Sequence, residues 1–227
     1  MKLYYFAMYG RAEPIRLMLT AAGLEFEDVR ITFDEWKDLK SDTEKFEYGC
    51  MPVLEREGKY YSQSGALLRF VGKLCNYVPT DVEDIYSVEK LLDLVGDFNA
   101  GLIKLHYTKD EDAKKKLFGE YLENFFPKYF GFFESHLKEN SSKEFIVGDS
   151  YTIADFPILH ILERCCYSDA FKEAVKPIVD NYPALKEYFE TRYGAMKDYF
   201  ETRPVCPLPH ISFQSTLLVL GSYPLLV

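Results

Sequence analysis

Apolar residues in the first part of the chain change their spacing from strand-like to helix-like. Residues 2–6 are a short aromatic and apolar run, as in a buried strand. Ile15, Met18, Leu19 and Ala22 then recur at intervals of three and four residues, which places them on one face of a helix. The pattern predicts a strand followed by a helix.

The pattern then predicts three more strands and a second helix, with a polar stretch among them. The expected order is a strand at 26–31, an irregular or briefly helical stretch at 32–48, a strand opening at 52–55, a turn at 57–59, a strand at 60–61 and a helix at about 63–77. Helices and strands that alternate in this way predict an α/β layer with a small mixed sheet.

The composition changes near residues 78–81, and no convincing strand follows before about residue 200. Helical spacing is expected over 82–106, 112–138, 153–167 and 182–200. We therefore predict an α/β domain over 1–79, an all-helical domain over 80–209 and a separate tail over 210–227.

One helix start has a folding signal of its own. Thr152 and Asp155 have the spacing of a capping box, with Asp in place of the usual Glu or Gln. The Thr152 side chain is expected to accept from the Asp155 N–H, and the Asp155 carboxylate from the Thr152 N–H. Tyr151 and Phe156 occupy the positions of a hydrophobic staple.

The tail carries an apolar run at 216–220 after two prolines, Pro207 and Pro209. The run is far too short to span a bilayer. Two interpretations stay open: the tail packs over a hydrophobic pocket, or it is a disordered extension.

Charge and composition narrow the class of protein. The 227 residues carry a net charge of −9, which argues against non-specific nucleic-acid binding, because that needs Lys and Arg at phosphates. There is no secretory pattern at the N-terminus and no apolar window of membrane-spanning length, so we expect a cytoplasmic protein with no membrane partner. The five cysteines lack metal-ligand spacing and are expected to be free thiols, with no metal bound.

Four sequence motifs suggest a specific chemistry. They are Tyr5-Phe6-Ala7-Met8-Tyr9-Gly10-Arg11-Ala12-Glu13, Gly49-Cys50-Met51-Pro52-Val53-Leu54, Gln63-Ser64 and the stretch 148–155. Together, in this order and spacing, they resemble the cytosolic glutathione S-transferases over residues 1 to about 205. The match looks nearest the sigma class, with mu and pi as near relatives.

The resemblance implies a thioredoxin-like α/β domain followed by an all-α domain, and glutathione as co-substrate. It implies that Tyr5 is the catalytic tyrosine, supported by Arg11. A phenol that donates to sulfur stabilises the thiolate and not the thiol, and a free thiol has a pKa near 8.5. Tyr4 is expected on the opposite face of the strand and Tyr9 in the turn. The first helix, expected to begin near Arg11, adds a favourable dipole.

The resemblance also suggests how the rest of glutathione is held. Gln63 and Ser64 resemble the pair at the γ-glutamyl end, where a helix start presents free N–H groups to an anion. Met51, before Pro52, is expected to offer its backbone to the cysteinyl unit if the Met51–Pro52 bond is cis. Two further residues resemble those that hold the glycyl carboxylate, namely Trp36 and Lys40.

Asp97 resembles an acidic residue that reaches the γ-glutamyl amine from a neighbouring subunit. A homodimer with shared sites is therefore expected, with Arg69 near the dimer contact. A solvated helix face is the alternative reading of Asp97.

Two residues depart from the family pattern. Cys50 stands where sigma-like members commonly have Lys or Gln, so glutathione affinity is lower, or Trp36 and Lys40 suffice, or Cys50 is a redox-sensitive thiol, or it is inert. Tyr9 stands where many relatives have Arg. The pocket for a hydrophobic electrophile is expected from Met8, Tyr9, Leu102 and Leu105.

The sequence is compatible with three functions. The first is an enzyme that adds glutathione to hydrophobic electrophiles in detoxification, or reduces lipid hydroperoxides. The second is a non-catalytic, crystallin-like protein that keeps the transferase fold. A thioredoxin-like disulfide oxidoreductase is the third, and the lack of a Cys-x-x-Cys motif argues against it.

Overall fold

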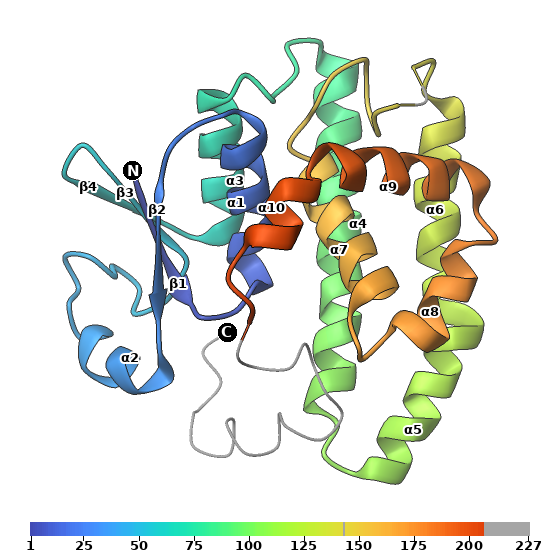
Figure 1. Cartoon of the computed structure of the whole chain (residues 1–227), viewed down its shortest axis with the longest axis horizontal. Coiled ribbons are helices and arrows are strands. Elements are labelled where there is room, and N and C mark those ends of the chain that lie inside the picture. Colours follow the sequence, from blue (N-terminus) through green and yellow to red (C-terminus); the bar gives the residue numbers. More distant parts are fainter. Residues whose placement is uncertain (143, 207–227) are drawn as a thin grey trace. The chain divides into compact units, whose positions relative to one another are not determined.

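The computed structural model describes residues 1–142 and 144–206. By their contacts these residues form two compact units (Figure 1). The first unit is Met1–Val78 together with residues 198–206, and the second is Pro79–Lys197. The expectations for the tail at 210–227 lie outside the described residues.

A four-stranded sheet is the centre of the first unit. Its strands are β1 (Lys2–Phe6), β2 (Glu27–Ile31), β3 (Val53–Arg56) and β4 (Lys59–Ser62). They lie in the order β2-β1-β3-β4. β1 pairs parallel with β2 and antiparallel with β3, while β3 and β4 form an antiparallel hairpin. This is the small mixed sheet that the sequence predicted.

The first unit also contains several helices and a 3-10 turn. They are a 3-10 turn η1 (Gly10–Ala12), α1 (Glu13–Ala21), α2 (Phe33–Leu39), α3 (Ser64–Leu74) and, from residue 198 onward, α10 (Lys197–Thr202). The first helical segment was expected to begin near Arg11, and Arg11 lies in the 3-10 turn that leads directly into α1 at Glu13. α2 begins with a capping box between Thr32 and Glu35. α1 and α3 pack against each other, and α1 buries the side chains of Ile15, Leu17, Met18 and Leu19.

The regular elements in the described part of the second unit are all helices. It contains α4 (Val82–Tyr107), α5 (Glu111–Glu120), the π-helical turn η2 (Tyr121–Phe125), α6 (Phe126–Glu139), α7 (Asp155–Tyr167), α8 (Lys172–Val179) and α9 (Pro183–Ala195). The helix expected over 112–138 therefore contains a π-helical turn. The periodicity missed α8, which is one short helix with Pro177 inside it.

The start of α7 follows the predicted capping motif in part. The Asp155 carboxylate accepts from the Thr152 N–H at 2.8 Å, as expected. The Thr152 hydroxyl, however, donates to the same carboxylate at 2.9 Å and does not accept from the Asp155 N–H. Tyr151 stacks on Phe156 as a staple, with ring centroids 5.3 Å apart. Tyr188 also donates to Asp155, so this carboxylate connects α9 to the start of α7.

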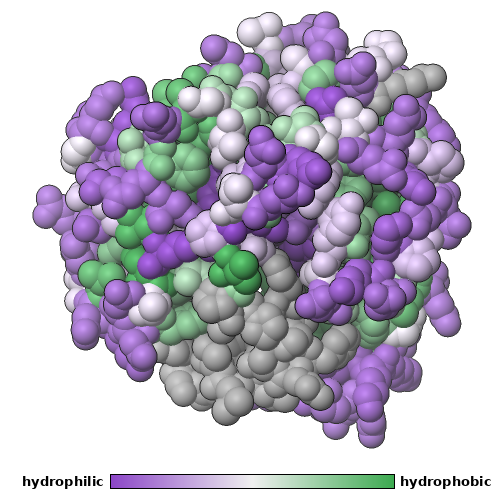
Figure 2. Space-filling view, in the orientation of Figure 1, coloured by the Kyte–Doolittle hydropathy of each residue, from purple (hydrophilic) through white to green (hydrophobic). Residues whose placement is uncertain are grey.

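Hydrophilic residues cover most of the face shown in Figure 2. Among residues 1–142 and 144–206, no helix combines the length and apolar character that crossing a membrane requires.

Candidate functional site

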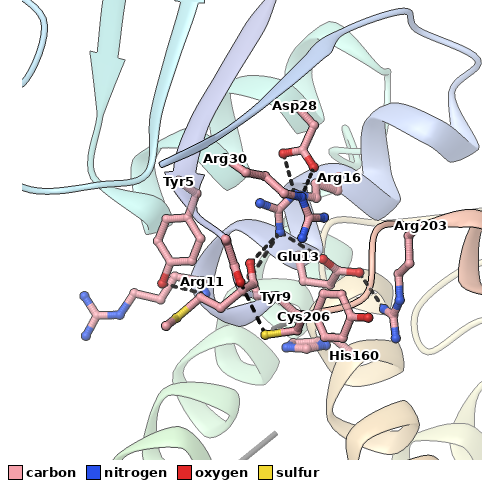
Figure 3. A network of polar contacts seen from close by, with 12 residues as sticks. Tyr5, Tyr9, Arg11, Glu13, Arg16, Asp28, Arg30, His160, Arg203 and Cys206 are labelled. Atoms are coloured by element: carbon pink, nitrogen blue, oxygen red, sulfur yellow. Dashed lines mark hydrogen bonds and ion pairs between the residues drawn. The ribbon is translucent and has the colours of Figure 1, made fainter. Parts of the chain in front are cut away.

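Tyr5 is held at the end of β1 against the loop that follows it (Figure 3). Its side chain is buried, with 7% exposed. The backbone N–H of Arg11, in η1, donates to Tyr5 Oη at 3.2 Å. This bond uses an acceptor site of the phenol oxygen and leaves its single O–H available to donate elsewhere.

The environment of Tyr5 keeps the phenol protonated. Burial raises the pKa of Tyr5, and this effect outweighs the Arg11 N–H and the charges of Arg11 and Arg16, which lower it. The resulting pKa lies above the ordinary value of 10.0. At neutral pH Tyr5 is therefore a hydrogen-bond donor and not a base.

Gly10 allows the loop to lie directly on the phenol. It has a φ of +46°, which a residue with a side chain rarely adopts. The site that a Cβ would occupy points at the Tyr5 hydroxyl. The backbone can approach Tyr5 this closely because Gly10 has no side chain.

Beneath this loop lies a buried network of charges, drawn in Figure 3. Arg16 is 1% exposed, and its Nη1 donates to the carbonyls of Met8 and Tyr9 at 3.1 and 3.2 Å. The same guanidinium pairs with Glu13 at 3.0 Å and with Asp28 at 2.8 Å. Arg16 therefore fixes the main chain between β1 and η1.

The start of α3 lies at a strained residue. Gln63 has a φ of +70° and a ψ of 109°, a conformation that costs free energy in any residue with a side chain. No side-chain hydrogen bond caps the helix at this position. Since the first amides of a helix lack intrahelical partners and carry a partial positive charge, this end of α3 can accept a carboxylate.

The segment before β3 lies beside Gln63. The Met51–Pro52 bond is cis, as expected, and both residues are buried. Gln63 Nε2 lies 4.0 Å from Cys50 Sγ. Lys40, at the end of α2, is exposed, and its carbonyl lies 3.7 Å from the position of a Cβ on Gly49. The structure thus brings Lys40, Cys50 and Gln63 into one region of the first unit.

Trp36 is less available than expected. It is 7% exposed and packs edge-on against Phe6 and Phe46, with centroid distances of 5.9 and 4.9 Å. Most of its indole ring contributes to the core between α2 and the sheet.

Three further predicted site residues lie in the second unit, on α4. Asp97 is exposed, whereas Leu102 and Leu105 are 5% and 2% exposed.

Sequence reasoning gave no role to three residues in or beneath the loop over Tyr5, namely Gly10, Glu13 and Arg16. Charged residues at helical spacing on α1 look like a solvated face, so burial of Glu13 and Arg16 leaves no signal in the periodicity. Among the described residues, no group of three or more His, Cys, Asp or Glu side chains is placed to hold a metal ion.

Comparisons with known proteins match both units. Residues 1–73 match the family model "Glutathione S-transferase, N-terminal domain", and residues 96–203 match "Glutathione S-transferase, C-terminal domain". Among curated proteins, the class-mu 28 kDa glutathione S-transferase isozyme of Schistosoma japonicum is 31% identical over 191 residues, which covers 82% of this chain and 88% of that protein.

Solved structures agree. Prostaglandin synthase D of Nilaparvata lugens is 31% identical, with a TM-score of 0.76, and the match covers 90% of this chain and 98% of that one. A monomeric glutathione S-transferase of the hookworm Necator americanus is 33% identical, with a TM-score of 0.77 over 90% of this chain and 97% of that one. The chain therefore belongs to the glutathione S-transferase family and is an enzyme of that family.

Proposed function

We propose that this enzyme activates the thiol of glutathione through the Tyr5 hydroxyl and adds the resulting thiolate to hydrophobic electrophiles. The observation that supports this proposal most directly is the hydrogen bond from the Arg11 N–H to Tyr5 Oη at 3.2 Å. It orients a buried, protonated phenol whose O–H has no acceptor among residues 1–142 and 144–206 and can donate to a sulfur atom.

A hydrogen bond from Tyr5 favours the anion of glutathione, because the thiolate is the better acceptor. If the bound thiol pKa falls by about two units from about 8.5, roughly three quarters of the bound thiol is ionised at pH 7, against about 3% without the shift. The thiolate then attacks the electrophilic carbon, a sulfur–carbon bond forms, and the leaving group departs with the electron pair. Reduction of lipid hydroperoxides by the same thiolate is proposed as a second activity.

The remaining glutathione contacts are proposals with supporting geometry. Gln63, Ser64 and the free amides of α3 suit the γ-glutamyl carboxylate. Met51, followed by Pro52, suits the backbone of the cysteinyl unit. Lys40 and Trp36 suit the glycyl carboxylate. Cys50 follows Gly49, whose Cβ position lies 3.7 Å from the Lys40 carbonyl.

Arg11 would add positive charge near the sulfur, since its charge already lowers the pKa of Tyr5 in part. Met8 and Tyr9 on the loop, with Leu102 and Leu105 on α4, are proposed to line the electrophile pocket.

Three broader assignments are also proposals, drawn from the resemblance. They are membership of the sigma class, a role in detoxification in the cytoplasm, and a homodimer in which Asp97 completes the partner's site. Exposure of Asp97 on α4 is compatible with the last.

Conjugation of glutathione to a chlorinated dinitrobenzene, measured from pH 6 to 9, tests the role of Tyr5. Tyr5→Phe is expected to lose roughly 25-fold at pH 7 and less than about twofold at pH 9, from the thiolate fractions of pKa values near 6.5 and 8.5. Tyr4→Phe is the matched control, because Tyr4 donates to Glu55 at 2.6 Å and not to the loop. Equal pH profiles for Tyr5→Phe and wild type would refute the proposal. Binding of glutathione without turnover by the wild type would favour a non-catalytic protein.

A further inference from the structure

Two segments far apart in the sequence meet over α1 in the first unit (Figure 3). Tyr199 Oη and Arg203 Nη1 both donate to Glu13 Oε1, at 2.9 and 2.6 Å. Three residues further on, the Cys206 thiol lies 3.4 Å from the carbonyl oxygen of Ala7 and donates to it. Residues 199–206, which we call the C-terminal clamp, therefore touch both ends of the segment 7–13.

Arg203 also contacts the middle of that segment. Its guanidinium carbon lies 3.8 Å from the centroid of the Tyr9 ring, within the range of a cation–π contact. The Arg203 guanidinium thus forms an ion pair with Glu13 and a cation–π contact with the face of the Tyr9 ring. A lysine cannot reproduce this, since it lacks the planar fork.

From Glu13 the contacts lead to Tyr5. The second carboxylate oxygen of Glu13 accepts from Arg16 Nη1 at 3.0 Å, and that same nitrogen donates to the carbonyls of Met8 and Tyr9. Gly10 and Arg11 follow directly, and the Arg11 N–H is the donor to Tyr5 Oη.

These charges are withdrawn from water, which makes the arrangement sensitive to each partner. Glu13 is 0% exposed, and the side chain of Arg203 is 5% exposed. Removing one member of a buried ion pair leaves an uncompensated charge, so the neighbours rearrange. Burial, and then the charge of Glu13, raises the pKa of Tyr199, so its hydroxyl stays protonated as a donor.

We propose that Tyr199 and Arg203 are positioning residues for the reaction at Tyr5: by holding Glu13 and Tyr9, they keep the Gly10–Arg11 backbone on the phenol. The inference rests on the proposed function of Tyr5. It assigns to the C-terminal clamp a part in tuning the bound thiol that acts through the loop.

Tyr199→Phe and Arg203→Lys test this, each with a matched control. Tyr4→Phe removes another tyrosine–glutamate hydrogen bond of the same unit. Arg192→Lys changes another buried arginine, which lies over Phe145 and Tyr151 and near Glu144 in the second unit. Two measurements are made on the full chain: hydrogen exchange of the peptide covering residues 7–13, and the pH midpoint of the ultraviolet absorbance of bound glutathione thiolate.

Both clamp variants are expected to exchange the 7–13 amides at least about threefold faster and to raise the thiolate midpoint by about half a unit, which corresponds to a threefold shift in the ionisation constant. If the 7–13 amides exchange no faster in the clamp variants than in the controls, the C-terminal clamp does not hold this segment and the proposal is overturned. Faster exchange with an unchanged midpoint overturns the positioning role and leaves a purely structural contact. A wild type that forms no bound thiolate overturns the proposed function of Tyr5, and the positioning role with it.

Discussion

A Cβ on Gly10 would lie 2.8 Å from Tyr5 Oη. Real Cβ atoms are essentially never found this close to another heavy atom, and here the neighbouring atom is the proposed catalytic oxygen. The loop and the phenol therefore cannot be changed independently of each other.

Gly10→Ala is expected to lower kcat/KM for glutathione conjugation by about tenfold or more, because the methyl group pushes the loop off Tyr5 and shifts the Arg11 N–H. Part of any stability loss comes from the positive φ alone, at about 1 kcal/mol. Steady-state kinetics and thermal unfolding of the same preparation separate the two effects.

Gly58→Ala is the matched control for Gly10→Ala. Gly58 has a φ of +74°, and nothing lies within 4 Å of its Cβ site. It should show a similar loss of stability with unchanged kinetics. If Gly58→Ala lost as much activity as Gly10→Ala, the contact with Tyr5 would not be the cause.

Gln63→Gly is expected to stabilise the protein and weaken glutathione binding at once. Glycine relieves the strain at a φ of +70°, which gains about 1 kcal/mol in the free energy of unfolding. Loss of the side chain would remove the hydrogen bond that Gln63 is proposed to make to the γ-glutamyl carboxylate, so KM for glutathione should rise about tenfold or more. Denaturant unfolding and a glutathione titration measure the two effects.

Asn76→Gly provides the comparison, because Asn76 also has a positive φ, +58°, just after α3. It should gain stability with no change in KM. A Gln63→Gly protein with unchanged KM would remove Gln63 from the proposed site.

Glu134 is expected to make part of the free energy of unfolding depend on pH. It is 5% exposed, accepts from the Leu185 N–H at the start of α9 at 2.7 Å, and pairs with Lys138 at 2.8 Å. Burial pushes the pKa of Glu134 up, but Lys138 and the amides of Leu185 and Ala184 outweigh it, so the pKa lies below the ordinary value of 4.5. The unfolded chain therefore takes up this proton first as the pH falls.

The stabilisation by the Glu134 carboxylate is therefore present above about pH 4.5 and is lost as the pH falls through the folded-state pKa. Glu134→Gln should be less stable than wild type by about 1–2 kcal/mol at pH 7. This difference in the free energy of unfolding between Glu134→Gln and wild type should become smaller below about pH 4.5. Urea unfolding at several pH values measures it, with Glu139→Gln, an exposed residue of α6, as the control. A gap that stays constant from pH 7 to pH 3 would contradict the assignment.

Much of the fold follows from local sequence signals. The strand at residues 2–6, the turn at Gly58 and the helical spacing of Ile15 and Leu19 each depend on neighbouring residues, so the sequence alone reveals them. α8 was missed because it is short and contains Pro177. One of the two hydrogen bonds expected between Thr152 and Asp155 was wrong. The Thr152 hydroxyl donates to the carboxylate and does not accept from the Asp155 N–H, because a hydroxyl can rotate and donate as readily as it accepts.

The sequence pointed to site residues only where they stand in a motif that resembles the family's. The cis bond before Pro52 was expected from such a motif and is confirmed, whereas the roles of Tyr5 and Gln63 stay proposals. The buried network stands in none, because Glu13 finds its partners more than 180 residues later, at Tyr199 and Arg203. Contacts between residues so far apart do not affect the hydrophobic periodicity of the sequence. Two charged residues on α1 are therefore interpreted as facing solvent.

The first unit is built from two pieces, Met1–Val78 and residues 198–206. A ribosome synthesises the chain from the N-terminus, so the sheet and α1 leave the exit tunnel long before Tyr199 and Arg203 exist. In that interval Glu13 has Arg16 as its partner but neither donor from the C-terminal clamp. The nascent first unit can therefore form its sheet early, but the loop over Tyr5 reaches its final form only when nearly the whole chain has been made.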